Sequence, residues 1–233
     1  IGYSVYQNDY NGAVMYGYPP ATLNGGPVTA EYQGHTFGNP VGRRYPWRLI
    51  PYVDGVWEMM HSHTDTPEIP NGSDSPSDAF GKAYILSIGP AYGLNDVYVG
   101  GNASFGGFIG ASPNEQPNVG KHVVFHNAEV HRPSELIVLG ESQLRNVYSP
   151  DYDPNDGSFH LTPPNANGQK WRADGDGFDI ITPTSLGIPK GRYGPTAAMG
   201  FFDGHVEGKA PRDLEDMRYW ANGATAEDYN YTP

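Results

Sequence analysis

The stretch Gly194-Pro-Thr-Ala-Ala-Met-Gly-Phe-Phe-Asp203-Gly204-His205-Val-Glu-Gly-Lys-Ala210 decides how we expect this chain to fold. Two short apolar runs meet at Asp203-Gly204, and an Asp-Gly pair tolerates the positive φ angles of a tight type I′ turn. The stretch therefore predicts a β-hairpin close to the end of the 233-residue chain.

The segment that follows, Pro211-Arg-Asp-Leu-Glu-Asp-Met-Arg-Tyr-Trp220, predicts a short helix. Pro211 suits the first turn, where a missing N–H costs nothing. Leu214, Met217 and Ala221 recur at helical spacing, and Gly223 provides a stop. Hairpin and helix form a closing unit over residues 194–223, and no residue pattern in it indicates chemistry.

Working back along the chain, we expect an α+β fold with a mainly antiparallel sheet and long Gly/Pro-rich loops. Residues 1–12 read as the end of an N-terminal helix that packs on this sheet, and a second helix should begin near Trp47 and stop or kink at Pro51. Apolar runs bounded by turn residues predict short strands elsewhere. They lie at Val97–Gly101, Lys121–His126, Glu135–Gly140 and Phe178–Thr182, with a further short apolar element at Phe80–Leu86. No linker or internal repeat divides the chain, so we expect one domain over residues 1–233.

The composition excludes several classes of protein. The formal net charge is −12 and Lys/Arg residues are not clustered, which argues against nucleic-acid binding. The chain has no cysteine, so disulfides and Cys-based zinc sites are excluded. No apolar run approaches the ~20 residues that span a bilayer, and the sequence shows neither a signal peptide nor an initiator Met. The 31 Gly and 22 Pro residues predict a loop-rich domain.

The closing stretch resembles the C-terminal signature of planctomycete-type prepilin-like proteins. That signature is a His, a nine-residue gap and then Asp-Gly, usually followed by His-Val. This chain keeps Asp203-Gly204-His205-Val206 but has Tyr193 at the place of the signature His. Other segments resemble the same family, namely Tyr6–Gly12, Arg44–Tyr52, Tyr92–Asn95, Tyr98–Gly101 and Arg132–Leu139.

The resemblance implies a pilin-like or pseudopilin-like globular domain that works as a structural, non-enzymatic subunit of an extracellular filament built from copies of itself. Members of this family begin with a cleaved leader and a long apolar helix, which we expect to be missing here. Contact with a membrane is therefore expected only through that absent helix, and not through the present chain.

Two acidic loops are candidates for a calcium site. The first holds Asp151, Asp153, Asn155 and Asp156 before Gly157, and the second holds Asp174, Asp176 and Asp179. Ca²⁺ takes six to eight hard oxygen ligands, which alternating Asp and Asn side chains in a tight loop can supply. The same residue types also form solvated turns, and the spacing departs from an EF-hand loop. Major pseudopilins, which the chain distantly resembles, hold calcium in a C-terminal loop.

The remaining patterns give weaker indications. His61, His63 and Asp65 have the alternation that places three ligands on one face of a strand, as a zinc or iron hydrolase would need. The aromatic residues Tyr16, Tyr18, Tyr32, Tyr45 and Trp47 suit either a sugar-stacking platform or core and subunit packing. His122, His126 and His131 form no recognisable metal motif, and a Gly-x-Ser-x-Gly elbow is absent from the sequence. Sequons for glycans occur at Asn71, Asn102 and Asn230.

These observations favour an extracellular structural subunit of a homopolymeric helical filament on a bacterial surface. A secreted carbohydrate-binding envelope module is the first alternative, and a metal-dependent hydrolase is the second. Calcium is the one cofactor we expect, and the partner is another copy of this chain.

Overall fold

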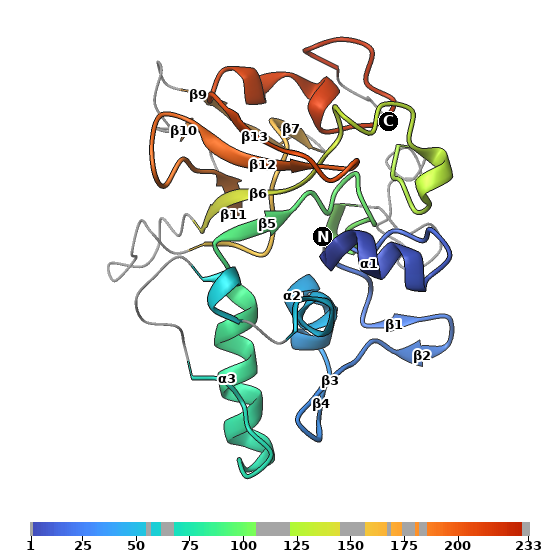
Figure 1. The fold of residues 1–233 in the computed structure, drawn as a ribbon, viewed down its shortest axis with the longest axis vertical. Helices are drawn as coiled ribbons and strands as arrows, with labels where there is room; N and C mark the ends of the chain where they lie inside the picture. The colour runs from blue at the N-terminus through green and yellow to red at the C-terminus, as the bar shows by residue number, and fades with distance from the viewer. Residues whose placement is uncertain are drawn as a thin grey trace.

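A computed structural model describes residues 2–54, 57–61, 68–105, 122–144, 157–166, 169–173, 180–181 and 186–229. A five-stranded antiparallel sheet lies at its centre (Figure 1). The central strand β6 (Ile137–Leu144) pairs with β5 (Tyr92–Leu94), β11 (Leu186–Pro189) and β12 (Ala197–Phe201), and β12 pairs in turn with β13 (Val206–Lys209). The expected α+β class is confirmed.

The helices and small hairpins surround this sheet. The α-helices are α1 (Gly2–Asp9), α2 (Tyr45–Leu49) and α3 (Pro76–Ile88). Short 3₁₀ helices are η1 (Val41–Arg43), η2 (Ile50–Val53), η3 (Trp57–Met60), η4 (Ala103–Phe105), η5 (Asn127–Glu129), η6 (Asp213–Glu215) and η7 (Met217–Tyr219). Two-stranded pairs are β1 (Thr22–Leu23) with β2 (Gly26–Pro27), β3 (Ala30–Tyr32) with β4 (His35–Phe37), β7 (Asn165–Ala166) with β8 (Gln169–Lys170), and β9 (Arg172–Ala173) with β10 (Ile180–Ile181).

The closing hairpin is present, but its turn differs from the predicted type. Of the two turn residues, Gly204 alone adopts a positive φ, 93°, whereas type I′ needs positive φ at both. The Phe201 N–H donates to the His205 carbonyl, and the Gly204 N–H donates to the Phe201 carbonyl. These bonds define a three-residue loop with glycine at its left-handed position, so the type I′ prediction is wrong.

The predicted C-terminal helix is also wrong in detail. Two separate 3₁₀ turns, η6 and η7, replace it because Asp216 interrupts the run. Asp216 has extended backbone angles, φ −76° and ψ 109°, and its carboxylate accepts a hydrogen bond from the Arg218 N–H. An Asp that bonds to the backbone in this way starts a new turn rather than continuing a helix.

The N-terminal and central helices follow from local sequence. Residues 2–9 form the expected helix α1, and α2 gives way to the 3₁₀ helix η2 where Pro51 enters, as Pro51 predicted. The element expected at Phe80–Leu86 is part of the longer helix α3. Ser75 caps α3 by accepting a hydrogen bond from the Asp78 N–H, and Pro76 occupies the first turn.

The strands predicted at Val97–Gly101 and Lys121–His126 are not formed by the residues that the structure describes, and isolated β-bridges take their place. Gly100 and Gly101 have φ of 77° and 78°, which breaks the extended run expected over Val97–Gly101. In the described part of Lys121–His126, pairing is limited to isolated bridges, one of them between Val99 and Val124. The strand β5 just upstream, which was not predicted, pairs with β6 in the sheet instead.

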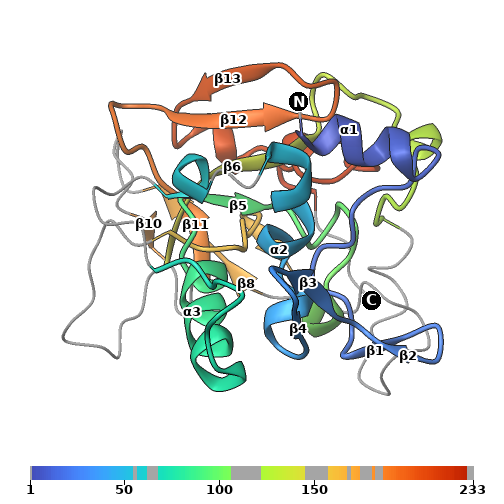
Figure 2. The ribbon, with the colours of Figure 1, turned by 60° about the horizontal axis from the view of Figure 1, so that its bottom comes forward.

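The sheet separates two apolar cores. Val138 faces a core shared with α2 and α3, and its neighbour Ile137 faces a second core with Leu214, Met217 and Trp220 of the C-terminal segment. Figures 1 and 2 show the α-helices on one side of the sheet and the C-terminal turns on the other. This layering places α1 beside the closed end of the β12–β13 hairpin.

Candidate functional site

An apolar groove lies between α1, α2 and the closing hairpin, with a volume of about 350 Å³. Its walls come from parts of the chain that are distant in sequence. They are Tyr3, Ser4, Tyr45, Leu49, Val53, Met60, Tyr92, Val138, Leu139, Ala198, Gly200, Phe201, Phe202, Gly204, His205 and Val206. We call this feature the apolar groove.

The floor of the apolar groove is rigid. Tyr45 is buried, and its hydroxyl donates a hydrogen bond to the Tyr92 carbonyl at the start of β5. Burial raises the pKa of Tyr45 above its ordinary value, so this phenol stays neutral. Because the floor residues belong to a helix and a strand, the groove is preformed.

The rim of the apolar groove carries a polar pair on the hairpin loop. The His205 Nδ1–H donates to the Asp203 Oδ1 at 2.6 Å, and the His205 ring stacks on Phe201 with centroids 4.4 Å apart. This hydrogen bond holds the pKa of the Asp203 carboxyl below its ordinary value. Val206, beside this pair, has 70% of its surface exposed and adds an apolar side chain to the rim.

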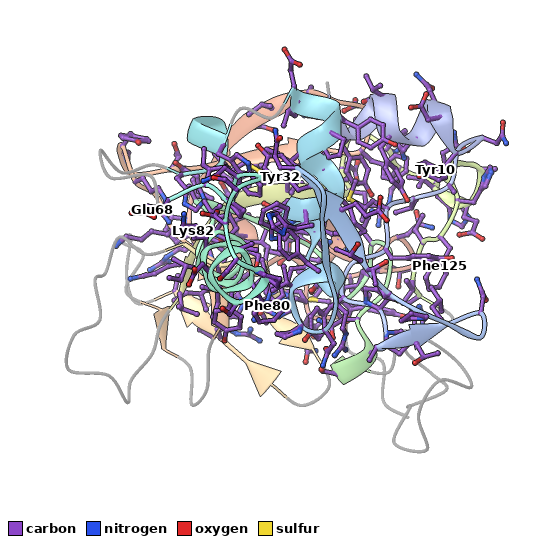
Figure 3. The ribbon with its side chains drawn as sticks, turned by 90° about the horizontal axis from the view of Figure 1, so that it is seen from below. Tyr10, Tyr32, Glu68, Phe80, Lys82 and Phe125 are labelled. Atoms are coloured by element: carbon purple, nitrogen blue, oxygen red, sulfur yellow. The ribbon has the colours of Figure 1, made fainter. Side chains whose placement is uncertain are left out.

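A second depression, which we call the aromatic hollow, also borders α1. It has a volume of about 420 Å³ and is lined by Tyr6, Tyr10, Ala13, Val14, Tyr16, Leu23 and Phe125. Tyr6 and Tyr10 stack with centroids 4.4 Å apart, and Tyr16 meets Phe125 edge to face. Burial, together with a hydrogen bond to Tyr10, raises the pKa of the adjacent Tyr52 to about 12. Figure 3 shows Tyr10 and Phe125 on the same side of the molecule.

The loop beneath α1 is held by Arg48 of α2. Its guanidinium donates to the carbonyls of Gly17 at 2.8 Å and Arg43 at 3.0 Å. Burial lowers the pKa of Arg48 to about 10. A buried arginine that bonds to backbone carbonyls fixes the loop, and hence the position of Tyr16 at the edge of the aromatic hollow.

An exposed apolar face occurs on α3, which lies on the other side of α2 from α1 (Figures 1 and 2). Phe80, Tyr84 and Ile85 are all exposed there, and Phe80 and Tyr84 have the i, i+4 spacing of one helix face. Lys82 points elsewhere and pairs with Asp74 at 2.9 Å and Glu68 at 3.3 Å (Figure 3). The apolar face is therefore free of Lys82, the one basic side chain of α3.

The residues predicted to bind calcium lie outside the described part of the chain. This applies to Asp151, Asp153, Asn155, Asp156, Asp174, Asp176 and Asp179 alike, and to His63 and Asp65 of the alternative His/Asp site. Among the residues that the structure does describe, no group of three or more His, Asp or Glu side chains is placed to hold a metal ion.

The other residues singled out in the sequence make packing or hydrogen-bond contacts within the fold. His126 caps η5 and contacts the Asn11 carbonyl through Nε2, while His122 lies against Tyr229. Of the five aromatic residues singled out in the sequence, Tyr45 and Trp47 are in the core, whereas Tyr16 is exposed at the aromatic hollow. Asn102 is fully buried and bonds to Asp96, so this sequon does not fit a glycan in the folded chain.

Comparison with protein-family models, curated proteins and solved structures finds no match for this chain. Within the described ranges, no helix combines the length and the apolar character required to cross a bilayer.

Neither depression was predicted from the sequence, and the α3 face was not predicted either. The apolar groove is formed by residues from α1, α2, β6 and the hairpin, and no local sequence pattern predicts that these segments come together. The α3 face had a usable signal, because Phe80 and Tyr84 are four residues apart in a segment that opens with Ser-Pro.

Proposed function

We propose that this chain is a structural subunit of an extracellular, pilus-like filament assembled from copies of itself. The observation that carries the proposal is a pair of unlike apolar surfaces, one at α1 and one at α3, with α2 between them. The first, the α1 surface, consists of Val5, Tyr10, Tyr16 and Val206 with the two depressions beside them; the second, the α3 surface, consists of Phe80, Tyr84 and Ile85.

The physical argument concerns symmetry. Contiguous apolar patches on a protein surface usually mark interfaces. A contact between two unlike patches joins copies head to tail, and such contacts give open helical filaments when the rotation between copies does not close. A stable contact of this kind buries about 1,000 Å² or more in total. An apolar helix face that docks into a preformed groove is a common way to reach that area.

The resemblance of the sequence to prepilin-like proteins points to the same function. The acidic, cysteine-free composition is compatible with a location outside the cytoplasm at a bacterial surface. Calcium bound by the two acidic loops would belong to this function as a structural ion.

The test uses one charge in each surface. We expect Ile85→Glu to disable the α3 surface and Tyr10→Glu to disable the α1 surface, so that neither variant forms filaments by negative-stain imaging. Thr225→Glu is the matched control, because Thr225 is exposed on the C-terminal segment, away from both surfaces. Far-UV circular dichroism checks that all three variants are folded.

Mixing the two disabled variants gives the decisive result. Ile85→Glu keeps an intact α1 surface and Tyr10→Glu keeps an intact α3 surface, so one contact remains possible between them. Analytical ultracentrifugation of the mixture should show a 1:1 dimer that does not grow. A wild-type chain that stays monomeric at high concentration, or a dimer formed by either variant alone, would contradict the head-to-tail contact.

A carbohydrate-binding module is the second candidate, favoured by the exposed tyrosines of the aromatic hollow. Aromatic side chains on a surface stack on sugar rings. If this candidate is correct, the wild-type chain is a monomer, and Tyr10→Ala weakens oligosaccharide binding in calorimetry while Ile85→Ala does not.

A further inference from the structure

A buried carboxylate and a histidine meet beside the central sheet. The Asp96 Oδ2 contacts the His160 Nδ1, and the same oxygen accepts a hydrogen bond from the Asn102 side-chain amide at 2.9 Å. The Asp96 side chain is 2% exposed and that of His160 is 16% exposed. We call this pair the Asp96–His160 dyad.

The backbone around His160 fixes the position of its ring. His160 forms a parallel bridge with Leu94 at the end of β5. Gly93 and Gly187 enclose its backbone, because a Cβ at either place would come within 2.2 Å of the His160 carbonyl oxygen. The histidine is therefore held by the central sheet on both sides, and not by a mobile loop.

The outer nitrogen of this ring is left available. In the described part of the chain, His160 Nε2 has no hydrogen-bond partner, and it is not among the enclosed polar atoms. Other histidines differ: His35 and His126 bond through Nε2 to backbone carbonyls, and His205 pairs with an exposed carboxylate. The Asp96–His160 dyad alone combines a buried carboxylate on one nitrogen with an open second nitrogen, among the described histidines.

This geometry determines the chemistry of the ring. A carboxylate that accepts from Nδ1–H fixes one tautomer of the neutral imidazole, with the proton on Nδ1 and the lone pair on Nε2. The carboxylate also stabilises positive charge that develops on the ring. An oriented imidazole of this kind is a base and a nucleophile.

We propose that the Asp96–His160 dyad is a nucleophilic site that accepts activated acyl groups at His160 Nε2. The rings that border it are Tyr18, edge to face at 5.6 Å, and Phe159. The Arg43 guanidinium lies 3.9 Å above the Tyr18 ring and packs against that wall of the site. Apolar aromatic walls suit an acyl ester with an aromatic leaving group.

The reaction balances without any cofactor. Nε2 attacks the carbonyl carbon, the bond from that carbon to the leaving oxygen breaks, and the alcohol component departs as its anion. The acyl group is then bonded to Nε2, with the positive charge of the ring facing Asp96. Water attacks the acyl carbon, the bond to Nε2 breaks, the acid is released, and one proton passes to solvent.

The first test needs no variant. Diethyl pyrocarbonate acylates unprotonated imidazole nitrogen, and peptide mass spectrometry identifies the modified histidine. In the folded full chain, we expect His160 to be modified faster than the more exposed His205. A folded chain in which His160 stays unmodified while His205 reacts would overturn the proposal.

The second test measures release of p-nitrophenolate from p-nitrophenyl acetate. We expect His160→Gln to remove hydrolysis above the level of the blank and Asp96→Asn to lower the rate at least about tenfold, since Asn favours the wrong tautomer. His131→Gln is the matched control and should keep the wild-type rate, because His131 is exposed and lies outside the dyad and both depressions. Equal rates for wild type and His160→Gln, with both chains folded by near-UV circular dichroism, would refute the acyl-transfer function.

Discussion

Gly204 offers the sharpest test of how the closing hairpin is held. Its φ of 93° lies in the left-handed region, and a Cβ built there would meet only the Ser4 hydroxyl, at 4.0 Å. Space is therefore available, and a substitution is penalised by backbone conformation alone. The left-handed conformation costs an L-residue about 1–2 kcal/mol, and a β-branched residue fits it poorly.

We therefore expect Gly204→Val to lower the free energy of unfolding by about 1–2 kcal/mol or somewhat more. For a chain of this length, about 1 kcal/mol corresponds to roughly 2–4 °C in Tm, so calorimetry should show a loss of several degrees. Gly204→Asn should lose less, because Asn tolerates this conformation.

Gly194→Val is the matched control for this experiment. A Cβ at Gly194 also meets open space, but its backbone is not in the left-handed region. The control should stay close to the wild-type Tm. Equal Tm values for Gly204→Val and the wild type, or equal losses in both variants, would refute the conformational argument.

Three further predictions concern the core, the buried phenols and the acidic loops. Met199→Ala should cost about 2–5 kcal/mol in urea denaturation, because Met199 is fully buried against β6; unchanged stability would contradict the packing of the second core. Tyr45 and Tyr52 have raised pKa values in the folded chain, so folding is favoured by keeping these two phenols protonated. This stabilisation is complete below about pH 10, the ordinary pKa of tyrosine, and is lost as the pH rises through the pKa values of the folded chain. Ultraviolet titration should show delayed phenolate formation, whereas ionisation of every tyrosine near pH 10 would contradict this burial. EDTA should lower the Tm and added Ca²⁺ restore it if Asp151, Asp153 and Asp156 share an ion; no shift in either direction would remove the calcium proposal.

The sequence was most informative where the physical cause was local. The run Glu135–Gly140 and the Asp203-Gly204 pair predicted β6 and the hairpin, because continuous apolar runs and turn residues act over a few positions. The prediction of a C-terminal helix failed for an equally local reason that competes with periodicity, since the Asp216 carboxylate accepts a hydrogen bond from the Arg218 backbone N–H.

The candidate sites were beyond local reasoning. Asp96 and His160 are separated by 64 positions, and their contact depends on the bridge between His160 and Leu94 at the end of β5. The apolar groove depends on α1 reaching the hairpin from the other end of the chain. Contacts between such distant segments depend on the topology of the chain, and topology is difficult to predict from a single sequence that has no internal repeats.

The position of β6 has a consequence for the order in which the chain can fold. Its partner β5 is made before it, but β11, β12 and β13 are made after it. A nascent or partly translocated chain that ends before residue 197 therefore holds β6 with one edge unpaired and the second core without the wall formed by Leu214, Met217 and Trp220. Unpaired edges and exposed apolar surface make such intermediates prone to aggregation. Completion of this sheet must wait for β12 and β13, and any factor that holds the unfinished chain would need to cover β6 until then.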